Sequence, residues 1–233
     1  MLLTQQMQIG YLNIHFGFRV IHHSQTKTYI ESLKHLMSIM LKLPQVTFIA
    51  LTGKEFYKHE EVIDLCTTDI EWGAVKVIYD KDCDSIEKWN QKIIYDLPQY
   101  VFTSHAFLFH PDGYPINPRA WRDEWLELDY IGAPWPLPQD NYSYRTPSGK
   151  PVRVGNSVSL RSKKLMDLVA TRPMEFHYGN NNEDGQICVW ERDWLEEQGC
   201  KFATLEQAVY FSKENELPEN KGIKTFAFHQ VDL

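Results

Sequence analysis

The sequence lacks the features of a membrane-spanning, nucleic-acid-binding or disulfide-linked protein. No apolar run is long enough to cross a bilayer, and residues 1–10 show no signal-peptide pattern. No block of five or more basic residues occurs, and the formal net charge of -7 argues against a nucleic-acid surface. The four cysteines form neither a CxxC pair nor a zinc spacing, so we expect reduced thiols. Together these absences predict a cytoplasmic protein without a transmembrane segment.

The composition is that of one globular domain. The chain has 233 residues, of which 43% are hydrophobic, enough for one well-buried core but not comfortably for two. We therefore predict a single domain over residues 1–233. Aromatic residues make up 13% of the chain, and we expect some of them to line a pocket for a flat or sugar-like ligand.

Strand and helix patterns alternate along the first part of the chain. Apolar and β-branched stretches predict strands at 18–23, 46–51 and 75–79, and helical spacing predicts helices at 26–41 and 56–66. This β-α-β-α-β order implies an α/β fold with a central, mostly parallel mixed sheet flanked by helices.

Two polar stretches lie at element ends in this part of the chain. His22 and Ser24 follow the first predicted strand, where a nucleotide could dock, although histidines there are more often packed or solvated. The acidic run at 80–84 is consistent with a metal cluster or with a helix cap. Because a helix is predicted at 85–95, the capping interpretation is favoured.

The stretch at 100–136 organises the rest of the chain. Residues 101–109 are rich in β-branched and aromatic residues and lack the polar alternation of a half-exposed strand, which predicts a buried central strand. It is broken by His110, Pro111, Asp112 and Gly113, which place a carboxylate at the strand's carboxyl end, where ligands bind in open α/β sheets. An ordinary turn aspartate is the alternative. The aromatic segment 121–135 is expected to form a fixed wall around the site.

Three later features add polar groups to this picture. A strand predicted at 152–160 is interrupted by Gly155 and Asn156, which indicates a bulge or the close approach of a ligand. Arg161 opens a helix predicted to end near residue 170, where it could meet a phosphate or lie on a basic surface. Glu183 and Asp184 begin another helix, either as caps or as a carboxylate available as general base.

The end of the chain carries a lone histidine. A short helix is predicted at 205–211, bringing Tyr210 and Phe211 to the core, and His229 follows two aromatic residues, so we expect it to be pinned.

The order of these features resembles the GT-A class of nucleotide-sugar-dependent glycosyltransferases. That class has a DxD-type metal motif, a glycine-rich acceptor loop, an xED base motif and a C-terminal metal-binding histidine. The segments DYIGAPW (129–135), VGN-SLRS (154–162), ED (183–184) and FAFH (226–229) further resemble an uncharacterised family of glycosyltransferase-like domains found in polysaccharide-building proteins. The DxD position reads His110-Pro111-Asp112 and so keeps only one acid.

The resemblance implies a single GT-A-like, Rossmann-related domain, with a nucleotide-binding half at 18–109 and a metal and acceptor half at 110–233. It implies an inverting transfer of a sugar from a nucleotide-diphosphate donor to a glycan or lipid-linked glycan acceptor, with peripheral membrane association compatible with such acceptors. Asp184 would be the base, with Glu183 beside it, and Mn²⁺ or Mg²⁺ would bind Asp112, His229 and His110. Candidate donor- or acceptor-binding residues are His22, Ser24, Gly113, Asp129, Trp135, Gly155, Asn156 and Arg161. The alternative is a catalytically silent glycan-binding or scaffold domain of a larger glycan-assembly protein.

Overall fold

The computed structural model describes residues 40–54, 56–140, 144–174 and 182–230. Contacts divide the chain into residues 1–40 and 41–233, and the elements below belong to the second unit. The strand predicted at 18–23, with His22 and Ser24, lies outside the described residues, as does most of the helix predicted at 26–41.

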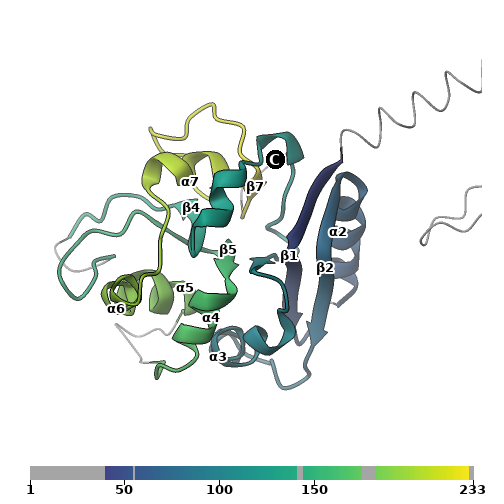
Figure 1. The fold of residues 1–233 in the computed structure, drawn as a ribbon, viewed down its shortest axis with the longest axis horizontal. Coiled ribbons are helices and arrows are strands. Elements are labelled where there is room, and N and C mark those ends of the chain that lie inside the picture. Colours follow the sequence, from purple (N-terminus) through teal and green to yellow (C-terminus); the bar gives the residue numbers. More distant parts are fainter. Residues whose placement is uncertain (1–39, 55, 141–143, 175–181, 231–233) are drawn as a thin grey trace, which may run out of the picture. The chain divides into compact units, whose positions relative to one another are not determined.

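One mixed sheet forms the centre of this unit (Figure 1). Its strand order is β2-β1-β3-β5-β4, and only β5 runs against the other four strands. The predicted α/β class with a mostly parallel mixed sheet is therefore confirmed. The strands are β1 (Leu41–Thr52), β2 (Ile70–Tyr79), β3 (His105–Leu108), β4 (Tyr130–Pro134) and β5 (Val154–Ser162).

Strand β1 begins at Leu41, whereas the sequence pattern predicts a strand only from residue 46 and a helix that ends at residue 41. Pro44 lies inside the strand and has no N–H to donate to the ladder, and the register with β2 shifts between Leu43 and Thr47. The partner strand has Gly73 at this point, and a Cβ there would collide with the Pro44 carbonyl. Proline and glycine together thus accommodate the irregularity.

Strand β3 is shorter than predicted but central, with all four residues buried between β1 and β5. Leu97–Tyr100 form a 3₁₀ turn (η1) instead of leading directly into the strand. The Thr103 hydroxyl then donates to the His105 carbonyl at 2.6 Å and contacts the Thr47 hydroxyl at 2.7 Å. Hydrogen bonds of the Thr103 side chain, rather than pairing with a neighbouring strand, thus hold the backbone just before β3 begins at His105.

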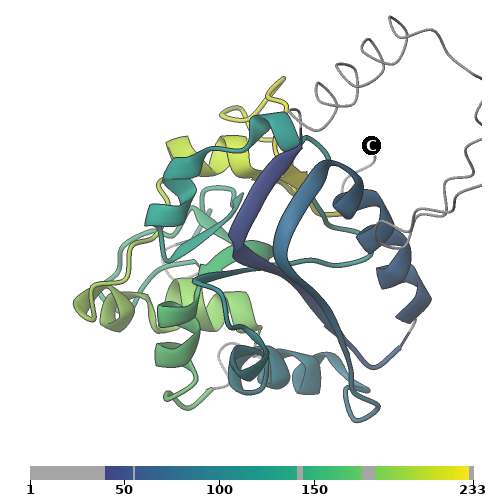
Figure 2. The same cartoon turned by 45° about the vertical axis from the view of Figure 1, so that its right-hand side comes forward.

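Helices cover both faces of the sheet (Figures 1 and 2). Successive side chains of β1 point to opposite faces, so Phe48 and Ala50 join one core and Ile49 and Leu51 join another. The first core includes residues of α2 (Phe56–Asp69) and α7 (Leu205–Phe211). The second includes residues of α3 (Ile86–Tyr95) and α4 (Lys163–Val169).

Aromatic residues fill the first core. Phe48 stacks on Phe109 and Trp72 at centroid distances of 4.0 and 4.7 Å, and Trp125 and Phe226 are fully buried nearby. Burial of such rings dominates core stability. Much of the aromatic content that we expected at a ligand pocket therefore stabilises the fold.

Helix α3 shows how the acidic run before it is used. Ser85 is the N-cap, and its hydroxyl accepts a hydrogen bond from the Lys88 N–H. Asp80 pairs with Lys92 and Asp84 pairs with Lys88. The acids thus support the helix, as the favoured interpretation predicted, although the cap itself is the serine.

The C-terminal part consists of short elements. These are α5 (Glu183–Gly185), a π-helical turn η4 (Gln186–Trp190), α6 (Arg192–Glu197), α7, and the parallel pair β6 (Ser212–Lys213) and β7 (Ala227–Phe228). The predicted helix at 205–211 is confirmed, but of the two aromatic residues expected in the core Phe211 is buried and Tyr210 is 36% exposed. Among the described helices, none has the length and apolar character needed to cross a membrane.

Candidate functional site

A tight turn follows the central strand and presents Asp112. His110 and Gly113 close the turn through two backbone hydrogen bonds of 2.8 and 3.1 Å. The Asp112 side chain is 58% exposed at the turn. The predicted carboxylate at the end of the central strand is therefore present, at the edge of the sheet where α/β proteins bind ligands.

His229 lies beside this turn. The β6–β7 pair fixes its backbone, since its N–H donates to the Lys213 carbonyl at 2.9 Å, and the next N–H, of Gln230, donates to the Asp112 carbonyl at 2.9 Å. The His229 Nε2 atom lies 3.9 Å from Asp112 Oδ1, and the residue is 8% exposed. The structure thus brings the two main predicted metal ligands together, and the expectation of a pinned histidine is confirmed.

Gly113 makes this approach possible. A Cβ at this position would lie 2.8 Å from His229 Cδ2 and at a similarly close distance from Val158 Cγ2. Such distances are shorter than van der Waals contact. Gly113 was predicted as a ligand-binding residue, and its observed contribution is to let the histidine ring pack against the turn.

Asp112 and His229 are spaced as two ligands of one divalent cation would be, with the remaining ligands supplied by a substrate and water. Two atoms that are each about 2.1 Å from one ion can lie up to about 4.2 Å apart, so the 3.9 Å separation is within reach. No group of three potential ligands occurs among the described residues. Ions that bind nucleotides usually have one or two protein ligands, and phosphate oxygens and water complete the coordination shell.

His110 has a packing role in this structure. Its ring lies 5.2 Å from the Trp89 ring and 5.4 Å from the His229 ring. Its Nε2 atom is buried and has no hydrogen-bond partner. Burial, followed by the neighbouring His229, lowers the pKa of His110 to about 3, so the ring is neutral.

Asn156 connects strand β5 to His229. It adopts a left-handed backbone conformation (φ 96°) and is 2% exposed. Its Oδ1 atom accepts from the Val158 N–H at 2.8 Å, its Nδ2 atom lies 3.0 Å from His229 Nδ1, and its carbonyl accepts from the Tyr130 hydroxyl. A non-glycine residue held in this conformation by several partners is typical of functional sites.

Trp135 and Gly155 pack against each other. A Cβ on Gly155 would collide with the Trp135 indole, and the Trp135 ring also lies 5.0 Å from the Tyr144 ring. Trp135 is only 7% exposed. The close approach predicted for Gly155 is therefore made by the protein's own tryptophan, and Trp135 has the structural role rather than that of an open wall for a sugar.

Asp129 is likewise held within the fold. Its carboxylate accepts hydrogen bonds from the Ser162 hydroxyl and, at 2.8 Å, from the Lys201 N–H. Ser162 is six residues along β5 from Asn156, a distance of about 20 Å in an extended strand. The structure therefore places Asp129 far from Asn156, although it was predicted as a ligand-binding residue.

Arg161 and Glu183 form a buried ion pair. Arg161 belongs to β5 and not to the following helix, and its guanidinium Nη2 donates to Glu183 Oε2 at 3.0 Å. The side chains are 2% and 0% exposed. Asn90 accepts from the Glu183 N–H at 3.2 Å, while Glu183 Oε1 has no partner. The sequence suggested that Arg161 binds a phosphate or lies on the surface. In the structure it does neither, because it is buried and paired with Glu183.

Asp184 has the properties of a general base. Burial, and then the adjacent Glu183 carboxylate, raise the pKa of Asp184 to about 7. Its Oδ1 atom accepts from the Gly185 N–H at 2.8 Å. A carboxyl group that titrates near neutral pH is suited to accept a proton.

Glu214 was not identified in the sequence. Its Oε1 atom lies 3.5 Å from His229 Nδ1, and its charge contributes to the raised pKa of Asp184. It follows β6 just as His229 follows β7, so the parallel register places the two residues side by side. No motif marks Glu214, and only the pairing of two very short strands could have revealed it.

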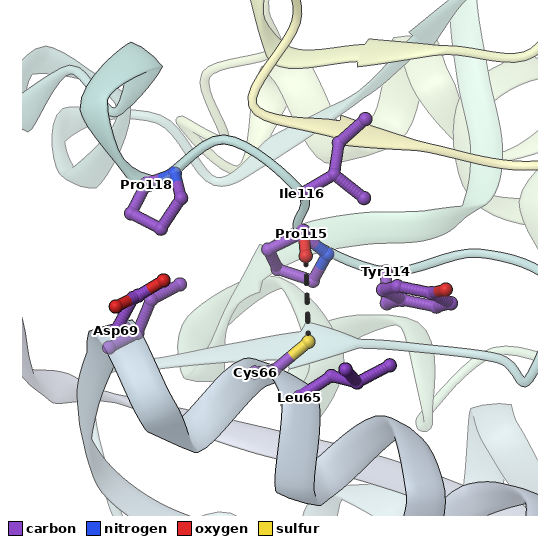
Figure 3. A pocket seen from close by; sticks show the side chains of 8 residues that line it. Leu65, Cys66, Asp69, Tyr114, Pro115, Ile116 and Pro118 are labelled. Atoms are coloured by element: carbon purple, nitrogen blue, oxygen red, sulfur yellow. Dashed lines mark hydrogen bonds between the residues drawn. The ribbon is translucent and has the colours of Figure 1, made fainter. Parts of the chain in front are cut away.

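A separate groove of about 280 Å³ lies between α2 and the segment that follows Gly113 (Figure 3). The Cys66 thiol donates to the Pro115 carbonyl across it at 3.5 Å. All four cysteines of the chain are buried, and no two of them are joined in a disulfide. The groove is lined by Leu65, Cys66, Asp69, Tyr114, Ile116 and Pro118, and none of these is a predicted site residue.

Comparison with known proteins identifies a family. No curated protein matches the chain. Residues 85–229 match a family described as "Protein of unknown function (DUF5672)", and this range contains Asp112, Asp184, Glu214 and His229. It covers well over half of the 233 residues. The chain therefore belongs to the DUF5672 family.

Proposed function

We propose that this protein is a nucleotide-sugar-dependent glycosyltransferase of the GT-A type. The observation that carries the proposal is the convergence of Asp112 and His229, 3.9 Å apart at the carboxyl end of a central strand. The mostly parallel sheet, which is compatible with a Rossmann-like nucleotide-binding fold, supports it.

Asp112 and His229 would hold Mn²⁺ or Mg²⁺ together with the donor's phosphates. Mn²⁺ is the better candidate because imidazole is a poor ligand for Mg²⁺. When bound, such an ion acts as a Lewis acid that neutralises the charge developing on the leaving diphosphate. Asp112 supplies the negative charge, and Gly113 lets the His229 ring pack against the turn that carries Asp112.

Asp184 would remove the proton from the acceptor hydroxyl. Its carboxylate is half-buried and titrates at about 7, so a substantial fraction is ionised at neutral pH. General base catalysis of this kind contributes about 10²–10⁴ in rate. The Arg161–Glu183 pair anchors the start of α5 and thereby fixes the backbone that carries Asp184. Direct attack assisted by one base gives inversion at the anomeric carbon.

The acceptor in this proposal is a hydroxyl of a glycan or a lipid-linked glycan, in polysaccharide biosynthesis. The reaction would take place on the cytoplasmic side, and peripheral association with a membrane would bring the enzyme to a lipid-linked acceptor.

Calorimetric titration with a panel of nucleoside diphosphates, with and without Mn²⁺, tests the proposal. We expect one nucleotide to bind only with Mn²⁺ and Asp112→Ala to abolish that binding. Asp64→Ala, on the exposed part of α2, is the matched control and should bind as the wild type does. Binding of no nucleotide would refute the proposed function, and equal binding by Asp112→Ala would refute the role of Asp112.

A catalytically silent glycan-binding or scaffold domain is the second candidate. It is favoured by the histidine that replaces one acid of the metal motif and by the lack of a third potential ligand in the described part of the chain. Turnover of the nucleotide sugar that corresponds to the bound nucleotide separates the two candidates, because a silent domain would bind without releasing the diphosphate.

A further inference from the structure

Hydrogen bonds fix where the proton of His229 lies. The Asn156 Oδ1 atom already accepts from the Val158 N–H, so the group that faces His229 Nδ1 at 3.0 Å is the Asn156 amide nitrogen, a donor. The Nδ1 atom must therefore be the acceptor. A neutral imidazole has one N–H, which then lies on Nε2, the nitrogen 3.9 Å from Asp112.

This tautomer cannot bind a cation at the expected place. A metal ligand must offer a lone pair, and on His229 the nitrogen nearest to Asp112 carries the proton. Binding of a divalent cation between Asp112 and His229 requires that the Nε2 proton leave to water and that Nδ1 take up a proton. The ring stays neutral in this exchange, and its new Nδ1–H needs an acceptor.

Glu214 is placed to be that acceptor. Its Oε1 atom lies 3.5 Å from Nδ1, on the same ring nitrogen that Asn156 contacts. The Glu214 side chain is 23% exposed, and its backbone follows directly from the β6–β7 pair that holds His229. His229 Nδ1 thus has a donor and an acceptor as alternative partners.

We propose that Glu214 is a positioning residue that selects the cation-binding Nδ1–H tautomer of His229, whereas the Asn156 amide favours the Nε2–H tautomer. The inference rests on the metal centre of the proposed function. A carboxylate that accepts from the second nitrogen of a ligating histidine both orients the ring and raises its basicity. Loss of such a partner typically weakens metal binding about 10- to 100-fold.

Mn²⁺ titration followed by electron paramagnetic resonance tests this proposal without any substrate. Glu214→Leu removes the acceptor, and we expect its Mn²⁺ affinity to fall about 10- to 100-fold. Glu214→Gln keeps an acceptor oxygen without the charge, and we expect an intermediate loss. The matched control is Glu216→Leu, because Glu216 is 59% exposed in the same loop and pairs with Lys213 at 3.2 Å. This control should stay within about twofold of the wild type.

The tautomer itself can be observed by nitrogen NMR of the imidazole of His229. Without a cation we expect the Nε2–H form, and with Zn²⁺ as a diamagnetic probe we expect the Nδ1–H form, in the wild type and in Glu216→Leu. In Glu214→Leu, Zn²⁺ should produce less of the Nδ1–H form at the same concentration.

The outcomes separate this inference from the proposed function. Wild-type affinity in Glu214→Leu, or an unchanged tautomer on Zn²⁺ binding, would overturn the role of Glu214 even if sugar transfer is observed. Absence of Mn²⁺ binding to the wild type would overturn it as well. Mn²⁺ binding that depends on Glu214, in a protein that binds and turns over no nucleotide sugar, would support the role of Glu214 while refuting the transferase.

Discussion

Replacement of Arg161 by methionine tests how the base-bearing segment is anchored. The substitution keeps an apolar stem but removes the cation that neutralises Glu183, whose side chain is 0% exposed and whose Oε1 atom already has no partner. It also removes the donors to Ser159 Oγ and the Ser157 carbonyl, at 2.8 and 3.3 Å. Removing one member of a buried ion pair costs about 3–5 kcal/mol, a large fraction of a domain's 5–15 kcal/mol.

The companion substitution is the double change Arg161→Met with Glu183→Leu. With both charges removed, no uncompensated carboxylate remains in the core, and replacement of a buried ion pair by apolar residues is often neutral or stabilising. We therefore expect the double variant to recover most of the stability that the single variant loses. The difference defines a coupling energy between the two side chains.

Urea denaturation followed by circular dichroism and tryptophan fluorescence measures these effects. With a slope of about 2 kcal/mol per molar urea, the single variant should unfold at a urea concentration about 1.5–2.5 M lower than the wild type. Arg119→Met, at an exposed position of η2 (Pro118–Ala120), is the control and should change stability by less than about 0.5 kcal/mol. The reasoning is refuted if Arg161→Met unfolds within about 1 kcal/mol of the wild type, or if the double variant is no more stable than the single one.

Four further predictions concern three residues. Activity should rise with pH through about 7 and then level off, because Asp184 must lose its proton to act as base, and Asp184→Asn should lower kcat by about 10²–10⁴ in a steady-state assay with nucleotide affinity retained. Because the pKa of Asp184 is raised, the folded state holds this proton more tightly than the unfolded state does, and ionisation of Asp184 lowers the free energy of unfolding as pH rises from about 4 to 7. Asp184→Asn should therefore be more stable than the wild type at about pH 8 but not at about pH 4. Urea midpoints measured at the two pH values would show this difference. Gly155→Ala should destabilise the protein by about 1–3 kcal/mol, with altered Trp135 fluorescence, because the added methyl group overlaps the indole ring. Gly113→Ala should weaken Mn²⁺ binding in a calorimetric titration, because it displaces His229 from Asp112, and unchanged affinity would contradict the packing argument.

The sequence predicts four strands of the sheet and the position of Asp112, because these follow from local rules, whereas β4 was expected only as part of an aromatic wall. A run rich in β-branched and aromatic residues makes a buried strand, and proline and glycine end it, so the carboxylate after the run had to lie at the sheet edge. The helix predicted at 26–41 is wrong at residue 41, which is the first residue of β1. Pairing of Leu41 with Ile70 in the sheet outweighs the local helical spacing.

Side-chain roles that depend on distant partners were not predictable in the same way. Arg161, Asp129 and Trp135 have the residue types of ligand-binding groups, but each meets a partner far along the chain that commits it to the fold: Glu183, Lys201 and Gly155. Conversely, Glu214 reaches His229 only through a two-residue strand pair, which leaves almost no periodic signal in the sequence.

Strand β7 is the last of the described elements of the chain to be synthesised. All five strands of the main sheet, together with Asp112, Asn156 and Asp184, precede residue 185, whereas His229 enters the site only when β7 pairs with β6. During synthesis the sheet can therefore be complete while the site still lacks its histidine. A nascent chain that ends between β6 and β7 would lack both His229 and Phe226, which is fully buried in the first core, so the same late segment completes the core and the site together.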